Sequence, residues 1–447
     1  MKNIRYYILW LCVALAALGA DASLTFTGAA DAVIEVDAPA SSGLDQVYVI
    51  SSTTGVTASY TARSSDVKWL CYSNLGGGYA QEVPVTVSGK TYSIALSQQD
   101  MGYIIEDGTD RFYCWVVNYA NHQAVLSALD IAPEQDCDRT RLTLSGQADP
   151  ITYYSINGRG IELDRELYLD YMTLEYDAEA GQFVSMSERQ TLASAQGSIG
   201  VPAPLCDTDF TLSADRFLRR WGREISVTSD TYRTNAVDAH TSAEQHIREA
   251  DNEQKIDGGA LGGSAPVDIT FTAEVSDAAV FRQWQISHDA DFEVLDDTYD
   301  QLSFDHTFTT NGTTYIRFTA DNASGTCPYV GETYEVFIGE SALMCPNAFS
   351  PGATEGVNDE WRVSYKSIVE FECHIFNRWG QQMCSFTDPA MGWDGRYRGK
   401  LVPAGVYYYV IKAKGSDGRR YDLSGDINIV RYRTTGTASG GETSPAE

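Results

Sequence analysis

The chain has 447 residues, of which 61 are acidic and 32 are basic, and its formal charge is −29. An acidic surface repels phosphate backbones, so this balance disfavours nucleic-acid binding. The length suggests about three or four domains of ordinary size. After residues 1–22, the sequence has no stretch long and apolar enough to span a membrane as a helix.

The first 22 residues are typical of a secretory signal peptide. Lys2 and Arg5 supply a positive start, and Ile8 to Leu18 form a short apolar run. Ala20 to Ala22 then offer the small residues that signal peptidase prefers. The alternative is an uncleaved membrane anchor, for which an apolar run of about 11 residues is too short.

Eight cysteines remain once Cys12 leaves with residues 1–22. They are Cys71, Cys114, Cys137, Cys206, Cys327, Cys345, Cys373 and Cys384. An even number of cysteines in an exported chain predicts disulfides and no free thiol. The sequence has no Cys-x-x-Cys pair, so a zinc or redox site of that type is not expected.

Short strand-like segments dominate the rest of the chain. Examples are Val47 to Ile50, Thr91 to Leu96, Tyr315 to Thr319 and Val406 to Ile411. They are rich in Tyr, Val, Ile and Thr, and turn residues separate them. This pattern predicts an all-β chain of tandem Ig-like or PKD-like β-sandwich modules that ends in a further β-sandwich.

The first predicted module covers residues 23–131. Cys71 and Cys114 each lie in a strand-like segment with aromatic neighbours. Their spacing suits a disulfide across the two sheets of an Ig-like sandwich. The alternative is a reactive cysteine with His122 nearby.

The second predicted module covers residues 132–257 and is β-rich with one helix. Cys137 and Cys206 form a plausible second bridge. The segment from Ala239 to Gln254 contains good helix formers and few breakers, so we expect a surface helix or linker there.

A basic cluster surrounds Trp221 in the second module. Its members are Arg216, Arg219, Arg220 and Arg223. Two interpretations remain open: an anion- or glycan-binding patch, or a solvated strand face with Trp221 in the core. The second interpretation is favoured.

The third predicted module covers residues 258–340 and resembles PKD-like or Ig-like modules. Gly258 to Ser264 predict a flexible joint before it. Asn311-Gly312 predicts a hairpin turn, and Trp284 is a candidate core residue.

An acidic cluster in this module could ligate calcium through oxygen atoms, or it could be a solvated loop. It comprises Asp289, Asp291, Glu293, Asp296, Asp297 and Asp300. The cluster lacks the glycine and the closing glutamate of an EF-hand loop, so the solvated loop is favoured.

The fourth predicted module covers residues 341–431, and a polar, disordered tail covers 432–447. If Asn377 to Gly380 form a hairpin loop, Cys373 falls directly opposite Cys384. Directly opposed residues are close enough for a disulfide after a small shift. Cys327 then remains to pair with Cys345.

Six pieces of the fourth module occur in the order of a known family. They are PNAFSP, GVND with Trp361, NRWGQ, WDG, VPAGVYYYVI and GDINIVR. In this order they resemble the gliding-motility-associated C-terminal domain, a type B sorting domain of the Bacteroidetes type IX secretion system. The matching residues are Pro346, Asn347, Phe349, Pro351, Asn358, Asp359, Trp361, Asn377, Arg378, Trp379, Gly380, Trp393, Asp394, Gly395, Gly405 and Tyr407.

The segment departs from the family in two places. Residues 352–356 replace an oxygen-rich Asn-Gly-Asp-Gly turn, which puts a calcium role for that turn in doubt. A tail also follows the domain in this chain, whereas in the family the domain tends to finish near the end of the chain.

The resemblance implies export through a periplasmic intermediate, with display on the cell surface or outer membrane, or release. The implied partners are the type IX secretion machinery and outer-membrane anchoring proteins. An envelope or host protein or glycan could be a further ligand.

No catalytic, metal-binding or cofactor-binding residue is predicted. The chain lacks His-Glu-x-x-His, a Gly-x-Ser-x-Gly elbow and a phosphate loop. The leading hypothesis is a non-enzymatic surface protein for adhesion or envelope contacts. The alternatives are a PorA-like signalling or accessory component of the secretion system, and a hydrolase with an unrecognised module.

Overall fold

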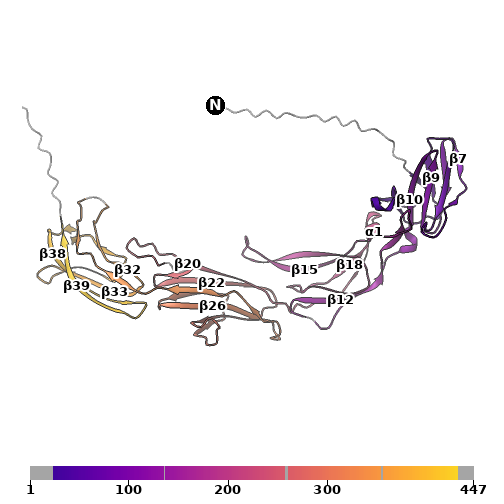
Figure 1. Cartoon of the computed structure of the whole chain (residues 1–447). Coiled ribbons are helices and arrows are strands. Elements are labelled where there is room, and N and C mark those ends of the chain that lie inside the picture. The colour runs from indigo at the N-terminus through magenta and orange to yellow at the C-terminus, as the bar shows by residue number, and fades with distance from the viewer. Residues whose placement is uncertain (1–23, 135, 257–259, 354–355, 431–447) are drawn as a thin grey trace, which may run out of the picture.

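The computed structural model describes residues 24–134, 136–256, 260–353 and 356–430. These residues form a curved row of four β-rich modules, from the N-terminal module at one end to the C-terminal module at the other (Figure 1). The prediction of an all-β chain is confirmed. The predicted signal peptide and C-terminal tail lie outside the described residues. We call the modules 1 to 4, and they cover residues 24–122, 125–234, 236–340 and 341–430.

Module 1 is a sandwich of two sheets. The first sheet runs in the order β1 (Leu24–Thr27), β4 (Thr57–Thr61), β8 (Thr91–Ala95), β7 (Thr86–Ser88). The second runs β2 (Ile34–Val36), β3 (Gln46–Ile50), β10 (Asp110–Asn118), β9 (Met101–Asp107), β5 (Val67–Tyr72), β6 (Gln81–Glu82). Two 3-10 turns, η1 (Ala40–Ser42) and η2 (Tyr119–His122), complete the module.

Module 2 has two sheets, a small hairpin and a short helix. One sheet is β11 (Val125–Ile131), β12 (Arg139–Gln147), β17 (Gly197–Pro202). The other is β16 (Gln182–Leu192), β15 (Leu167–Asp177), β18 (Thr211–Ala214), β19 (Ile225–Thr228). The hairpin is β13 (Ile151–Tyr154) with β14 (Gly160–Leu163), and the helix is α1 (Arg216–Arg220).

Module 3 packs a three-stranded sheet against a larger one. The smaller sheet is β20 (Ala239–His246), β22 (Val267–Val275), β25 (Ser303–Phe308). The larger is β21 (Leu261–Gly263), β28 (Tyr334–Ile338), β26 (Gly312–Asp321), β23 (Phe281–Ser287), β24 (Asp297–Tyr299), with β27 (Tyr329–Val330) also paired to β26. Trp284 is fully buried in this core, as predicted.

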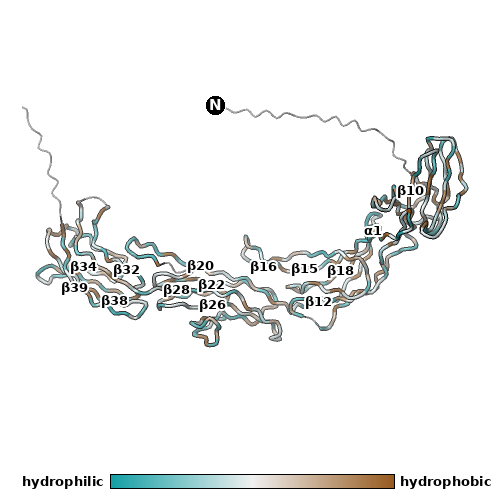
Figure 2. The backbone as a smooth tube through the Cα atoms, in the orientation of Figure 1, coloured by the Kyte–Doolittle hydropathy of each residue, from teal (hydrophilic) through white to brown (hydrophobic). Residues whose placement is uncertain are grey.

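Module 4 is built on one five-stranded sheet. Its order is β30 (Ala348–Phe349), β39 (Arg420–Ile429), β38 (Gly405–Gly415), β33 (Ile368–Phe376), β34 (Gln382–Phe386). Three small pairs cover it: β29 (Ala342–Met344) with β32 (Ser364–Lys366), β31 (Trp361–Arg362) with β35 (Gly392–Trp393), and β36 (Arg396–Tyr397) with β37 (Lys400–Leu401). Figure 2 shows the apolar stretches on the strands and the polar ones at turns and edges.

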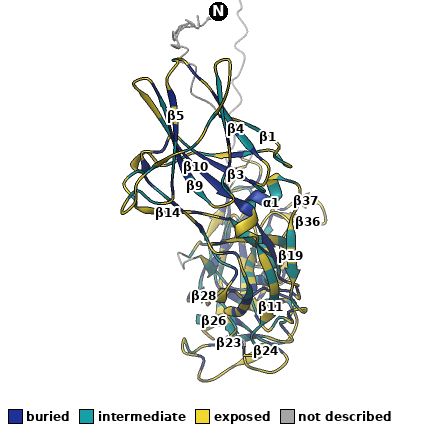
Figure 3. Ribbon diagram, turned by 90° about the vertical axis from the view of Figure 1, so that its right-hand side faces the viewer, coloured by how far each residue is buried: buried dark blue, intermediate teal, exposed yellow. Residues whose placement is uncertain are grey.

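The second sheet of module 1 is apolar on both of its faces. Tyr48 and Val116 point into the sandwich, whereas Val47, Val49 and Trp115 point away from it, yet all are buried. Strand residues alternate between faces, so a second layer must cover the outer face. Figure 3 shows buried residues along β3, β9 and β10, next to α1.

Module 2 supplies that second layer. Ile151, Tyr153 and Leu163 of the β13–β14 hairpin and Phe217 of α1 join one cluster with the outer face of module 1. Burial of large apolar side chains is worth about 1.5–3 kcal/mol each. Modules 1 and 2 therefore meet through a hydrophobic core and not through a linker.

A buried ion pair closes this core. Arg165 binds the carboxylate of Asp215 at 2.6 Å, and their side chains are 3% and 0% exposed. The Tyr119 hydroxyl donates to the same carboxylate, and the other carboxylate oxygen caps α1 by accepting the amides of Phe217 and Leu218 at 3.0 Å. The cap and the pair thus compensate the buried charges of Arg165 and Asp215.

Modules 3 and 4 meet along a seam of hydrogen bonds between side chains and backbone groups. The Ser367 amide donates to the Ser264 hydroxyl at 2.7 Å, and the Ser416 hydroxyl donates to the Gly339 carbonyl at 2.9 Å. The loop after β20 adds to the seam, since the Asn252 side chain donates to two carbonyl oxygens of module 4.

Three predictions about residues 239–264 are wrong. Residues 239–246 form strand β20, not a helix, and this strand pairs with β22 inside module 3. The predicted boundary at residue 257 therefore falls within a module. Residues 261–263 of the predicted joint form strand β21 of module 3, and residues 257–259 lie outside the described ones.

The predicted boundary at residue 131 and the predicted hairpin at Asn311-Gly312 are also wrong. Strand β11 pairs with β12, and Leu129 packs in the core of module 2. The strands on either side of Asn311, β25 and β26, lie in different sheets. The Asn-Gly pair thus connects two sheets of a sandwich.

We predict that Asp215→Ala lowers the free energy of unfolding of the module 1–2 unit by roughly 3–5 kcal/mol. The change leaves Arg165 buried without its partner and removes the cap of α1. Urea denaturation followed by tryptophan fluorescence measures it. Asp230→Ala is the matched control, because Asp230 is exposed. A loss below about 1 kcal/mol would contradict the assigned role of the pair.

Candidate functional site

Two buried tryptophans of the motif organise the core of module 4. Trp361 and Trp393 face each other across β31 and β35 and are 0% and 1% exposed. The Trp361 indole nitrogen donates to the Pro346 carbonyl at 2.7 Å, and that of Trp393 donates to the Arg396 carbonyl at 3.0 Å. Buried indoles usually find such partners, and here the backbone of the module supplies them.

Other motif residues join β30 to β39, the last strand of the module. Phe349 pairs in parallel with β39 and packs its ring 5.6 Å from that of Trp393. The Asn347 carbonyl accepts from the backbone and side chain of Asn428. The Tyr407 hydroxyl donates to a backbone carbonyl four residues earlier.

Gly395 occupies a position that only glycine fits. Its φ is +71°, and a Cβ there would lie 2.9 Å from Cγ of Pro351. The preceding residue, Asp394, accepts the Arg396 amide and so shapes the turn. Gly405 also has a positive φ, of +148°, at the start of β38.

One carboxylate bonds the backbone amides at both ends of the altered segment 352–356, of which residues 354–355 lie outside the described ones. One Asp359 oxygen accepts from Gly352 at 2.9 Å and the other from Gly356 at 2.7 Å. The Asn358 carbonyl accepts the Ser350 amide. The amides of Gly352 and Gly356 therefore use both oxygens of Asp359.

The tip of the β33–β34 hairpin exposes an aromatic side chain. The Asn377 side-chain oxygen accepts the amides of Trp379 and Gln381, both at 3.0 Å, and Gly380 completes the turn with φ of +79°. Trp379 is 75% exposed, and the Arg378 guanidinium lies 4.3 Å from its ring centroid. The backbone of this tip is thus ordered while its ring faces solvent.

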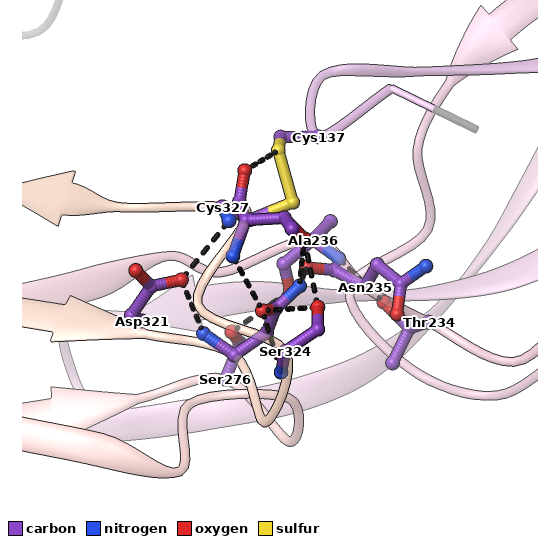
Figure 4. The surroundings of a disulfide bond; sticks show 10 residues. Cys137, Thr234, Asn235, Ala236, Ser276, Asp321, Ser324 and Cys327 are labelled. Carbon is purple, nitrogen blue, oxygen red and sulfur yellow. Dashed lines mark hydrogen bonds between the residues drawn. A yellow bond between two sulfur atoms is a disulfide. The ribbon is translucent and has the colours of Figure 1, made fainter. Parts of the chain in front are cut away.

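The structure contains a disulfide between Cys137 and Cys327 (Figure 4). It joins module 2 to module 3, across 190 residues of sequence. Closing so long a loop stabilises by about 5 kcal/mol in the chain-entropy description. The predicted pairings Cys137–Cys206 and Cys327–Cys345 are therefore wrong. The first was drawn from spacing within one module, which cannot reveal a bond between two modules, and the second was assigned because those cysteines remained.

Cys71 and Cys114 lie in one sheet and cannot form the predicted bridge between sheets. Both are register partners of Tyr103, from opposite sides of β9. Two strand spacings, about 9.5 Å in total, separate the backbones of the two cysteines. A disulfide needs Cα atoms within about 7 Å of each other.

The predicted Cys373–Cys384 pairing fails through a shift in register. Cys373 lies opposite Phe386 and Cys384 lies opposite Ile375, because an irregularity follows Ile375. The two cysteines are diagonal neighbours, for which the Cα separation is roughly 7–8 Å. Both are thiols, as are Cys71, Cys114, Cys206 and Cys345.

Burial makes these thiols poor nucleophiles. It raises the pKa of Cys373 to about 12, with smaller effects from the nearby Cys345 and Cys384, and it raises that of Cys114 as well. Thiolate is the reactive form of cysteine. The His122 ring bonds Asp100, so the structure does not bring a reactive cysteine and His122 together as an activated pair.

The basic cluster belongs to the joint between modules 1 and 2. Arg216 pairs with Glu166 at 3.0 Å, and Arg223 pairs with Asp31 of module 1. The half-buried Trp221 donates from its indole nitrogen to the Ala32 carbonyl at 2.8 Å. The favoured interpretation placed the cluster on the face of a strand. This is wrong, because the cluster begins on helix α1.

Sequence reasoning missed the residues that make this joint. Asp215 stands directly before the helical segment and is a typical N-cap residue. The sequence therefore contained a signal for the start of α1. Arg165 carried no comparable signal, because a lone arginine between strands gives no hint that it is buried.

The acidic cluster of module 3 is organised by hydrogen bonds. Asp289 accepts the amides of Asp291 and Glu293, and Asp296 accepts from the amide and ring of His288. The His288 ring and amide lower the pKa of Asp296. Across the described residues, no group of three or more His, Cys, Asp or Glu side chains is arranged to hold a metal ion.

We predict that digestion of the unreduced protein yields one linked peptide pair, containing Cys137 and Cys327. The other described cysteines should alkylate once the protein is denatured, because they are thiols within cores. Peptide mass mapping with and without reduction measures both. A linked pair containing Cys373 and Cys384 would contradict the register of β33 and β34.

Two family descriptions match parts of the chain. Residues 130–229 match the Fibronectin type III domain Fn3_FA, which is module 2, and residues 343–428 match the CHU_C Type IX secretion signal domain, which is module 4. A search of curated proteins finds no match. No helix long and apolar enough to span a membrane occurs in the described ranges.

Two solved structures are similar to most of the chain. A tetra-tandem repeat from the extending region of a large adhesion protein is 14% identical, with 84% of this chain and 95% of that one covered and a TM-score of 0.21. Dimeric latent PorU from Porphyromonas gingivalis is 12% identical, with 72% and 35% covered and a TM-score of 0.17. These values carry no argument about function.

The family match covers module 4 with its buried tryptophans, its glycine turn and its ordered hairpin tip. These residues lie where the six sequence pieces predicted the sorting domain. Module 4 is a type IX secretion signal domain, and the chain is a type B sorting-domain protein exported by that system.

Proposed function

We propose that this chain is a non-enzymatic surface protein that presents modules 1 to 3 for adhesion or envelope contacts. The observation that carries the proposal is that the signal module is joined through a seam of hydrogen bonds to a row of sandwiches with packed joints. Stiff joints hold module 1 at the far end of the row from the sorting module (Figure 1).

The chemistry of the described side chains supports a binding role more than a catalytic one. The ring of His122 pairs with a carboxylate and not with a serine or cysteine nucleophile. Three arginines of the basic cluster, Arg216, Arg219 and Arg223, are engaged in ion pairs, which lowers their attraction for an anion. The hydrolase alternative would need a site outside these groups.

The partners proposed for module 4 are the secretion machinery and outer-membrane anchoring proteins. We propose that the machinery contacts the Arg378–Trp379 tip, because Trp379 is the most exposed large apolar side chain of the motif pieces among the described residues. A flat ring with a guanidinium stacked on it is typical of a binding hot spot. The buried motif residues then act through the fold of the module.

A PorA-like signalling or accessory role is the second candidate. It is favoured only by the sorting-domain match, which such members share. Deleting the gene separates the two roles. Loss of attachment with normal secretion of other cargo supports adhesion, whereas altered secretion of other cargo supports signalling.

We predict that removing residues 341–447 retains modules 1 to 3 in the periplasm, since the signal domain lies in the removed part. Cell fractionation and protease treatment of intact cells measure the location. The truncated chain should fold, because the core of module 3 is formed almost entirely by its own residues. Unchanged exposure at the cell surface would refute export by module 4.

We predict that Trp379→Ala reduces the exported fraction by about tenfold, as the loss of one binding hot spot would do. The melting temperature of the variant should equal that of the unmodified chain, because the Trp379 ring is exposed. Tyr79→Ala is the matched control, since Tyr79 is 92% exposed at module 1. Normal export of the Trp379 variant, together with retention of the truncated chain, would contradict the proposed contact at the Arg378–Trp379 tip. The export role of module 4 would still stand.

A further inference from the structure

The Cys137–Cys327 bond offers a covalent route past modules 2 and 3. The chain enters module 2 along β11 (Val125–Ile131), and Cys137 follows this strand. Cys327 precedes β28 (Tyr334–Ile338), along which the chain leaves module 3. A path of bonds from module 1 to module 4 can therefore omit every residue between the two cysteines.

The omitted residues contain most of both hydrophobic cores. In module 2, Leu129 is the buried core residue that precedes Cys137. In module 3, Val336 and Ile338 are the buried core residues that follow Cys327. The other buried members of both described clusters lie inside the closed loop.

The segment that carries Cys327 is held in place by hydrogen bonds. The Asn322 side-chain oxygen accepts the amides of Ser324 and Thr326 at 3.1 Å, and the Cys327 amide donates to Asp321 at 2.9 Å. The Asn322 amide group also donates to the Asn235 carbonyl at the joint. Figure 4 shows Asp321, Ser324 and Asn235 around the bond.

Further contacts keep the two modules side by side around the bond. The long β15–β16 hairpin reaches toward module 3 (Figure 1), and its Tyr176 ring stacks on His240 of β20 with centroids 3.7 Å apart. The disulfide thus lies in a joint that is already packed, so it needs no large rearrangement to form.

We infer that the disulfide is a load bypass: it carries tension between modules 1 and 4 and protects the cores of modules 2 and 3 from being pulled apart. When the ends are pulled, force passes from β11 through Cys137 and Cys327 to β28. The loop of 190 residues carries no tension while the bond is intact. This mechanical role does not depend on how the chain is exported or on which ligand it binds.

The disulfide limits the length to which the folded chain can be stretched when its ends are pulled. An extended chain spans at most about 3.3–3.6 Å per residue. A loop of 190 residues therefore withholds on the order of 600–700 Å of length. Reduction by dithiothreitol would release this length, as the reagent closes to its cyclic disulfide and Cys137 and Cys327 become thiols.

Single-molecule pulling of the oxidised chain, held at its two ends, tests the inference. We expect the fully extended length to increase by about 600–700 Å when dithiothreitol is added. Cys327→Ser should show the longer length without reductant. Cys206→Ser is the matched control, because Cys206 is a buried thiol outside the bond, and it should behave as the unmodified chain.

Two results would overturn the inference. One is an equal extended length before and after reduction of the unmodified chain. The other is release of the full length of modules 2 and 3 at low force while peptide mapping shows the bond intact. The reduction of the unmodified chain decides the matter even if Cys327→Ser does not fold. Pulling is done on purified protein, so its outcome does not depend on export.

Discussion

The arrangement of the chain depends on one apolar surface, the outer face of the second sheet of module 1. Val47, Val49 and Trp115 point away from their own sandwich and would face water if module 1 stood alone. The hydrophobic effect favours covering such a face. The β13–β14 hairpin and α1 cover it, and the Arg165–Asp215 pair fixes their position. Gly158 of that hairpin allows close contact, since a Cβ there would lie 2.2 Å from the Gly76 Cα.

Each later joint uses a different interaction for the same purpose. A disulfide and an aromatic stack join modules 2 and 3, and hydrogen bonds between side chains and backbone groups join modules 3 and 4. None of the joints depends on a long exposed linker in the described ranges. A signal domain at one end can therefore hold the other modules in a defined direction, as a surface protein requires.

Local sequence patterns predicted the strands and the sorting motif, because both depend on neighbouring residues. They failed wherever distant segments decide the structure. β20 looks helical because its inward residues, such as Ala239 and Ala243, are small and give a weak strand pattern. The Cys373–Cys384 register assumed an unbroken ladder. The partner of Cys137 lies in another module, so no local spacing could identify it.

Small-angle X-ray scattering of the oxidised chain from residue 24 onward tests the central claim, that the packed joints make one curved, stiff row. The curve calculated from this structure should fit the data with a single arrangement of the four modules (Figure 1). Data that require a broad distribution of maximum dimensions, as four sandwiches on flexible linkers would give, would contradict the account.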